Sequence, residues 1–108
     1  MTPKPMYRQG DVLFIATGKP LPEKAEKDMS RVENGRQIIE YGEVTGHAHA
    51  FQHKLAQMYK WEGSSLVETK ENAQLTHEEH SAITFPDGVY EIRRQREYTP
   101  EAIRFVQD

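Results

Sequence analysis

The histidines of this chain are concentrated in two short segments whose spacing suits metal coordination. Three lie within residues 47–53 and two within residues 77–80: His47, His49, His53, His77 and His80. In a strand, side chains two residues apart project from one face about 7 Å apart, so the first three would share a face. His77 would share a face with His80 in a helical turn, or with Glu79 in a strand. The sequence therefore predicts that imidazoles from both segments meet in one polar site.

Imidazole and carboxylate ligands without thiolates suit a divalent transition metal such as Zn, Mn, Fe or Ni. A bound ion with an open coordination position would lower the pKa of a water ligand, and Glu79 or Glu78 would act as the general base. The second segment is not the HExxH pattern, because His77 and His80 are three residues apart rather than four. Two plainer interpretations stay open: histidines in polar segments are often surface residues, and adjacent glutamates often form a solvated face.

Residues 89–98 are predicted to form the last long strand, one face of which turns cationic. That face carries Tyr90, Ile92, Arg94, Arg96 and Tyr98. Arg94 and Arg96 would bind a carboxylate or a phosphate bidentately, and the Tyr98 hydroxyl would add a hydrogen bond. Pairing of these arginines with glutamates across neighbouring strands is an equal alternative.

Short apolar or alternating segments separated by turn signals predict a mainly β fold. Strands are expected at residues 12–16, 36–44, 47–53, 57–61, 65–69, 75–85 and 89–98. Asn34-Gly35 predicts a tight hairpin, because both residues tolerate positive φ. Pro86-Asp87-Gly88 predicts a further turn, because proline presets φ and glycine adopts the left-handed conformation.

The close spacing of these strands predicts one small barrel or sandwich over residues 1–108. Residues 18–30 are expected to be a loop, with one helical turn at residues 23–28. Thr99-Pro100 is expected to begin a short C-terminal helix, with threonine as N-cap and proline at the first helical position.

Composition limits the partners and the location of the protein. The chain has 108 residues, no cysteine and a formal net charge of −3. Disulfides and thiolate metal sites are excluded, and a reducing compartment is expected. The negative charge argues against a broad DNA-binding surface. No stretch approaches the roughly 20 apolar residues that span a bilayer, and the N-terminus lacks a signal peptide, so we expect a cytoplasmic protein without a membrane segment.

Three segments together resemble a family of small uncharacterised bacterial proteins: GEVTGHAH (42–49), LTHEEH (75–80) and GVYEIRRQREYTPE (88–101). This resemblance covers most of the chain, implies a bacterial or phage origin and brings no function with it. A weaker likeness to cupins rests on Gly42 ahead of His47-Ala48-His49 and on Pro86-Asp87-Gly88. Two positions depart from the cupin motifs, since His53 stands near an expected glutamate and Glu91 at an expected histidine. The likeness implies a small β-barrel with a metal in its mouth.

Three functions remain open from the sequence. The first is a metal-dependent hydrolase acting on a phosphoester or another anionic substrate. The second is a metal-free phosphodiesterase in which two histidines act as acid and base on RNA and an arginine stabilises the developing charge. The third is a non-enzymatic binding module in which the histidines hold a structural metal.

Overall fold

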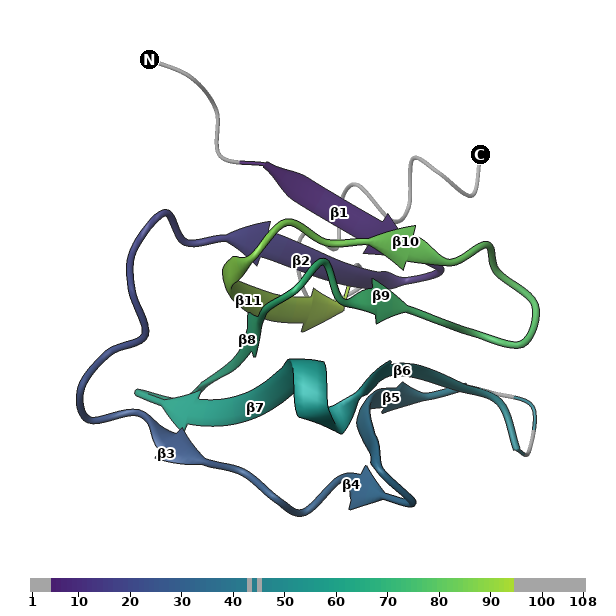
Figure 1. Ribbon diagram of the computed structural model, residues 1–108, viewed down its shortest axis with the longest axis horizontal. Helices are drawn as coiled ribbons and strands as arrows, with labels where there is room; N and C mark the ends of the chain where they lie inside the picture. The colour runs from purple at the N-terminus through teal and green to yellow at the C-terminus, as the bar shows by residue number, and fades with distance from the viewer. Residues whose placement is uncertain (1–4, 43, 45, 95–108) are drawn as a thin grey trace.

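Strands make up almost all of the regular structure. The computed structural model describes residues 5–42, 44 and 46–94 (Figure 1). These residues form β1 (Met6–Gln9), β2 (Val12–Ala16), β3 (Glu26–Lys27), β4 (Val32–Glu33), β5 (Arg36–Tyr41), β6 (Ala48–Gln52), the 3-10 turn η1 (His53–Leu55), β7 (Ala56–Trp61), β8 (Ser64–Thr69), β9 (Gln74–Leu75), β10 (Ile83–Thr84) and β11 (Gly88–Arg94). The predicted mainly β fold is confirmed. Within this part of the chain, no helix has the length and apolar character needed to cross a membrane.

The strands form three antiparallel sheets. The largest has six strands in the order β1-β2-β11-β8-β7-β3, and β10-β9 and β4-β5-β6 form the two smaller sheets (Figure 1). A bridge between Ala50 of β6 and Thr76, just after β9, connects the two smaller sheets. The described strands do not close into a barrel, so the barrel alternative of the sequence-based prediction is wrong.

Two hairpins follow the local turn chemistry. Asn34 and Gly35 have φ of 50° and 75° and connect β4 to β5, as predicted. Glu62 and Gly63 have φ of 49° and 78° and connect β7 to β8 in the same way. Positive φ at both central residues matches the right-handed twist of the flanking strands, so each turn sets its register.

Other expectations were wrong where tertiary pairing decided the structure. The helical turn predicted at residues 23–28 is replaced by β3, which pairs with the edge of β7. The strand predicted at residues 75–85 is interrupted, because β9 ends at Leu75 and β10 begins at Ile83. The intervening residues 76–82 are polar and offer no alternating apolar face to bury, so they form a loop, and this loop carries the second histidine segment. The predicted C-terminal helix lies outside the described residues.

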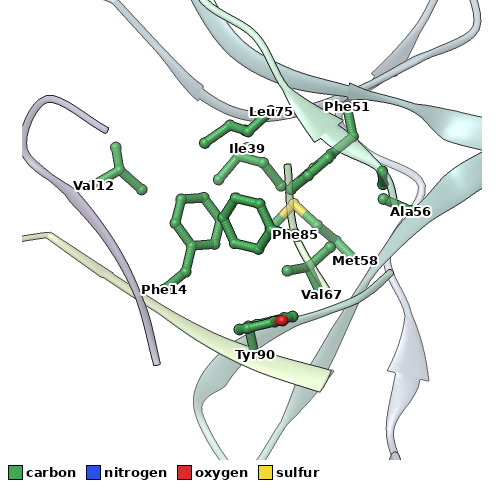
Figure 2. Close-up of a cluster of buried hydrophobic side chains, with 11 residues drawn as sticks. Val12, Phe14, Ile39, Phe51, Ala56, Met58, Val67, Leu75, Phe85 and Tyr90 are labelled. Carbon is green, nitrogen blue, oxygen red and sulfur yellow. The ribbon is translucent and has the colours of Figure 1, made fainter. Parts of the chain in front are cut away.

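A cluster of aromatic rings holds the sheets together. Phe85 is fully buried, and its ring centroid lies 4.9 Å from that of Tyr7, 5.0 Å from Phe14, 5.1 Å from Tyr90 and 5.2 Å from Phe51. Figure 2 shows the Phe85 ring beside that of Phe14, within the hydrophobic core. Tilted and edge-on pairs at this distance each contribute about 0.5–1.5 kcal/mol beyond burial. The cluster thus joins the six-stranded sheet to β6, the strand that carries His49.

Candidate metal centre

Four of the five histidines line one cavity of about 420 Å³. They come from both predicted segments: His47 and His49 from the start of β6, and His77 and His80 from the loop between β9 and β10. The turn between β1 and β2, the end of β5 and the end of β11 complete the wall with Gly10, Asp11, Glu40, Tyr41, Gly42 and Arg94. We call this cavity the histidine cleft.

The imidazole rings in the cleft lie at spacings that a shared ion requires. Two imidazoles on one ion, with bonds of about 2 Å, have ring centroids roughly 4.5–6.5 Å apart. The His77 centroid lies 5.6 Å from that of His47, 4.4 Å from His49 and 4.6 Å from His80, and the His49 and His80 centroids are 5.9 Å apart. His77 therefore occupies the middle of the cluster.

One group of three side chains brings its ligand atoms closest together. Each of His47, His77 and Glu78 offers one such atom, and the three atoms lie within 4.8 Å of one another. Glu78 is exposed, but its Oε1 accepts a hydrogen bond of 2.8 Å from the Ala48 backbone N–H. This hydrogen bond is the main reason why the pKa of Glu78 is lowered, and it keeps the carboxylate ionised and oriented toward β6.

His47 Nδ1 is buried and has no hydrogen-bond partner among the described residues. Glu79 Oε1 lies 3.9 Å from His47 Nδ1, which is too far for a hydrogen bond. A buried nitrogen without a hydrogen bond lowers the stability of the protein by about 1–3 kcal/mol. A ligand that bonds to this nitrogen would therefore be stabilised there. Glu79 itself is exposed at the mouth of the cleft, and its backbone N–H donates to His77 Nδ1 at 3.0 Å.

His49 is the most deeply buried of the four imidazoles, with 4% of its surface exposed. Its Nδ1 lies 2.8 Å from Oε1 of Gln9, a buried residue of β1. Burial, together with the neighbouring His77 and His80, lowers the pKa of His49 to about 4. His49 is therefore neutral at pH 7, the form in which imidazole binds a metal.

The structure does not bring His53 to the cleft. Strand β6 ends at Gln52, and the chain turns into η1, so the regular alternation that would have placed His53 with the others stops there. His53 Nε2 instead forms a 2.5 Å hydrogen bond with Gln57 Oε1, on the wall of a different cavity. The prediction that His53 shares one site with His47 and His49 is corrected accordingly.

Arg94 lies in the wall of the cleft, where it is engaged by a carboxylate. Its Nε donates to Glu40 Oε2 at 3.0 Å and its Nη2 donates to Glu40 Oε1, so the two side chains form a bidentate pair. Glu40 also lies 3.9 Å from Arg31. The guanidinium thus pairs with a glutamate, the plainer of the two roles predicted for it. Arg96 and Tyr98, the other members of the predicted anion site, lie outside the described residues.

The charge of the cleft favours a cation. Among the described residues that line it, Asp11, Glu40 and Glu79 are acidic, and Arg94 is the one arginine or lysine. These carboxylates outnumber the one guanidinium, and an excess of carboxylates attracts a metal ion and repels an anion.

Sequence reasoning missed two residues of the site. Glu40 and Gln9 are ordinary polar residues in strands, and nothing in their own spacing marks them. The one available signal for Gln9 is the alternation of β1, which places Gln9 on the same face as Tyr7, a residue packed against the core. A polar residue on the inward face of a strand indicates a buried hydrogen bond.

Comparisons with known proteins place the chain in a family. Neither a curated protein nor a solved structure matches it. One family, described as a domain of unknown function (DUF8820), matches residues 8–95. This range contains both histidine segments and every strand from β2 to β11. Because the match covers well over half of the chain, the protein belongs to the DUF8820 family of domains of unknown function.

Proposed function

We propose that this protein is a metal-binding β domain in which His47, His77 and Glu78 hold one divalent transition-metal ion. The observation that carries the proposal is the convergence of their ligand atoms within 4.8 Å, from segments about 30 residues apart in the chain. Two imidazole nitrogens and one carboxylate oxygen suit Zn, Mn, Fe or Ni. The excess of carboxylates in the cleft supports the same conclusion.

The three ligand atoms have to move closer together to bind one ion, and the movement is small. Ligand atoms on a tetrahedral ion with bonds of about 2 Å are roughly 3.3 Å apart, so the group has to contract by about 1.5 Å. Glu78 is exposed, so its carboxylate can shift toward the ion while Oε1 keeps the hydrogen bond from the Ala48 N–H. His77 can bind the ion through Nδ1 once it loses the hydrogen bond from the Glu79 N–H. Alternatively, the proton moves to Nδ1, which breaks the same hydrogen bond, and His77 binds the ion through Nε2. The Glu79 N–H is exposed, so water replaces that bond.

An ion with three protein ligands retains open positions for water, and such an ion lowers the pKa of bound water toward neutrality. Glu79, at the mouth of the cleft, is placed to act as the general base. We therefore propose hydrolysis of a phosphoester or another small anionic substrate as the reaction. Because the wall of the cleft is rich in carboxylates, it would repel an anionic substrate until the ion is bound.

Metal titration tests this proposal directly. Chelator-treated protein is titrated with Zn²⁺, Mn²⁺, Ni²⁺ and Co²⁺, and binding is followed by calorimetry and by elemental analysis. We expect about one equivalent of bound ion and, with a generic phosphoester, hydrolysis that EDTA abolishes. Less than about a tenth of an equivalent of every metal after reconstitution would overturn the proposal.

A metal-free acid–base pair is the second candidate, and one observation favours it. His77 Nδ1 accepts a hydrogen bond, so its Nε2 carries the proton in the neutral ring and can donate it. The His49 ring, neutral at pH 7, lies 4.4 Å away between centroids and could accept a proton. Phosphodiester cleavage that EDTA leaves unchanged, with a bell-shaped pH profile, would favour this candidate. A chelator-dependent melting temperature without hydrolysis would instead indicate a binding module with a structural metal.

Gly10 leaves room for the rings of His49 and His80, which pack against the proposed ligand His77. We expect Gly10→Ala to push these rings against His77 and so to weaken zinc binding roughly tenfold. A Cβ on Gly10 would lie 3.0 Å from His80 Nε2 and 3.3 Å from His49 Cε1, at a φ of +61°. Gly18→Ala is the matched control, because Gly18 has a φ of +70° and nothing within 4 Å. Urea unfolding should show a loss of about 1–2 kcal/mol in both variants from the backbone alone. Equal zinc affinity of the two variants would contradict this role of Gly10.

A further inference from the structure

We infer that Gln9 is a positioning residue for the metal centre: it holds His49 in the tautomer that has its proton on Nδ1 and its lone pair on Nε2. The inference rests on the proposed function and extends it: beside His47, His77 and Glu78, the lone pair of His49 Nε2 would offer the ion a fourth ligand, which leaves water the remaining positions of a five- or six-coordinate ion. The inference adds Gln9, a residue of β1, to the site. Its side chain hydrogen-bonds to His49 and to the backbone of Leu75 and Ser81.

The orientation of the Gln9 side-chain amide is determined by its surroundings. Gln9 Nε2 donates to the backbone carbonyl of Leu75 at 3.2 Å and to that of Ser81 at 2.9 Å. A flipped amide would place its oxygen against two carbonyl oxygens, and all three can only accept hydrogen bonds. The atom that faces His49 is therefore the oxygen Oε1.

An oxygen at this position dictates the protonation of His49. Gln9 Oε1 can only accept, so the 2.8 Å contact requires His49 Nδ1 to be the donor. In a neutral imidazole the other nitrogen, Nε2, then carries the lone pair. Since Nδ1 is engaged by Gln9, Nε2 is the nitrogen left for the cleft, where His77 and His80 are the neighbouring rings.

Burial makes this hydrogen bond strong enough to select one tautomer. Gln9 is 2% exposed and His49 is 4% exposed, so water does not compete for either side chain.

Gln9 also connects His49 to the loop that carries the other ligands. Leu75 and Ser81 stand at the two ends of residues 76–82, and Gln9 donates to the backbone of both. One amide therefore ties β1, His49 and both ends of the histidine loop together. Hydrogen-bond partners of this kind typically change metal affinity 10- to 100-fold when removed, because they orient the ligand and fix its tautomer.

The experiment compares three variants with the wild-type chain. Gln9→Met keeps the size of the side chain and removes the acceptor. Gln9→Glu keeps an acceptor oxygen toward His49 but replaces the donor that faces the Leu75 and Ser81 carbonyls with a second oxygen. Gln37→Met is the matched control, because Gln37 is also fully buried, donates to the Ile38 carbonyl and accepts from the Met58 N–H, whereas the hydrogen bond with His49 is made by Gln9. The readouts are ¹⁵N chemical shifts of the His49 ring in metal-free protein, assigned with His49→Ala, and the dissociation constant for Zn²⁺.

We expect the wild-type protein to show a protonated Nδ1 and an unprotonated Nε2 on His49. Gln9→Glu should keep this tautomer but unfold at a lower urea concentration, because its second carboxyl oxygen faces two carbonyl oxygens. Gln9→Met should lose this preference and bind Zn²⁺ roughly 10- to 100-fold more weakly, while Gln37→Met changes neither readout. A wild-type His49 protonated on Nε2 would overturn the inference even if Gln9→Met does not fold. An equal loss of affinity in Gln37→Met would also overturn it. If His49 shows the expected tautomer but the wild-type chain binds no metal, the proposed function fails and the hydrogen-bond assignment stands.

Discussion

Alanine in place of His77 is expected to weaken zinc binding by roughly a hundredfold or more while the protein stays folded. His77 belongs to the group that we propose as ligands, and its ring contacts those of His47, His49 and His80. Loss of its imidazole removes a bond to the ion and opens the middle of the cluster. The side chain is only half-buried in a loop, so the free energy of unfolding should change little.

His53→Ala is the matched control for this measurement. It removes the same side chain and a hydrogen bond to Gln57, but it lies on a different cavity, so its zinc affinity should equal that of the wild type. Affinity is measured by competition with a chromophoric chelator, and the Co²⁺ absorption spectrum reports the coordination number. If His77→Ala binds zinc as tightly as His53→Ala does, the ion is not held where we place it.

Replacing Phe85 with alanine should lower the free energy of unfolding by about 3–5 kcal/mol, the largest effect on stability that we expect. Phe85 is fully buried and contacts four aromatic rings, which lie on β1, β2, β6 and β11. The loss combines the transfer free energy of the ring with a cavity that the surrounding strands cannot fill. Because a domain of this size is stable by about 5–15 kcal/mol, much of the total would be lost.

Urea unfolding of metal-free protein measures this effect, with Trp61→Ala as the control. Trp61 is partly exposed at the end of the β7–β8 hairpin, so its loss should cost far less than the loss of Phe85. Phe85→Leu keeps most of the volume and should fall between the two. A change below about 1 kcal/mol for Phe85→Ala would show that the aromatic cluster does not hold the sheets together.

Local features of the fold were predictable because their causes are local. Asn34-Gly35 forms its hairpin through the φ preferences of two adjacent residues. The apolar run at Val12–Ala16 and the alternation along Gly88–Arg94 mark strands. The concentration of histidines near residues 47 and 77 also pointed to the segments that line the cleft. Each of these signals lies within about ten residues of chain.

The remainder depends on which distant segments meet. Gln9 reaches His49 because β1 occupies the edge of the six-stranded sheet beside the histidine loop, and Arg94 meets Glu40 across 54 positions of sequence. His53 is excluded from the cleft by a 3-10 turn that interrupts the alternation. Strand order and the placement of loops follow from burial of the whole core, a non-local free energy that residue spacing does not encode.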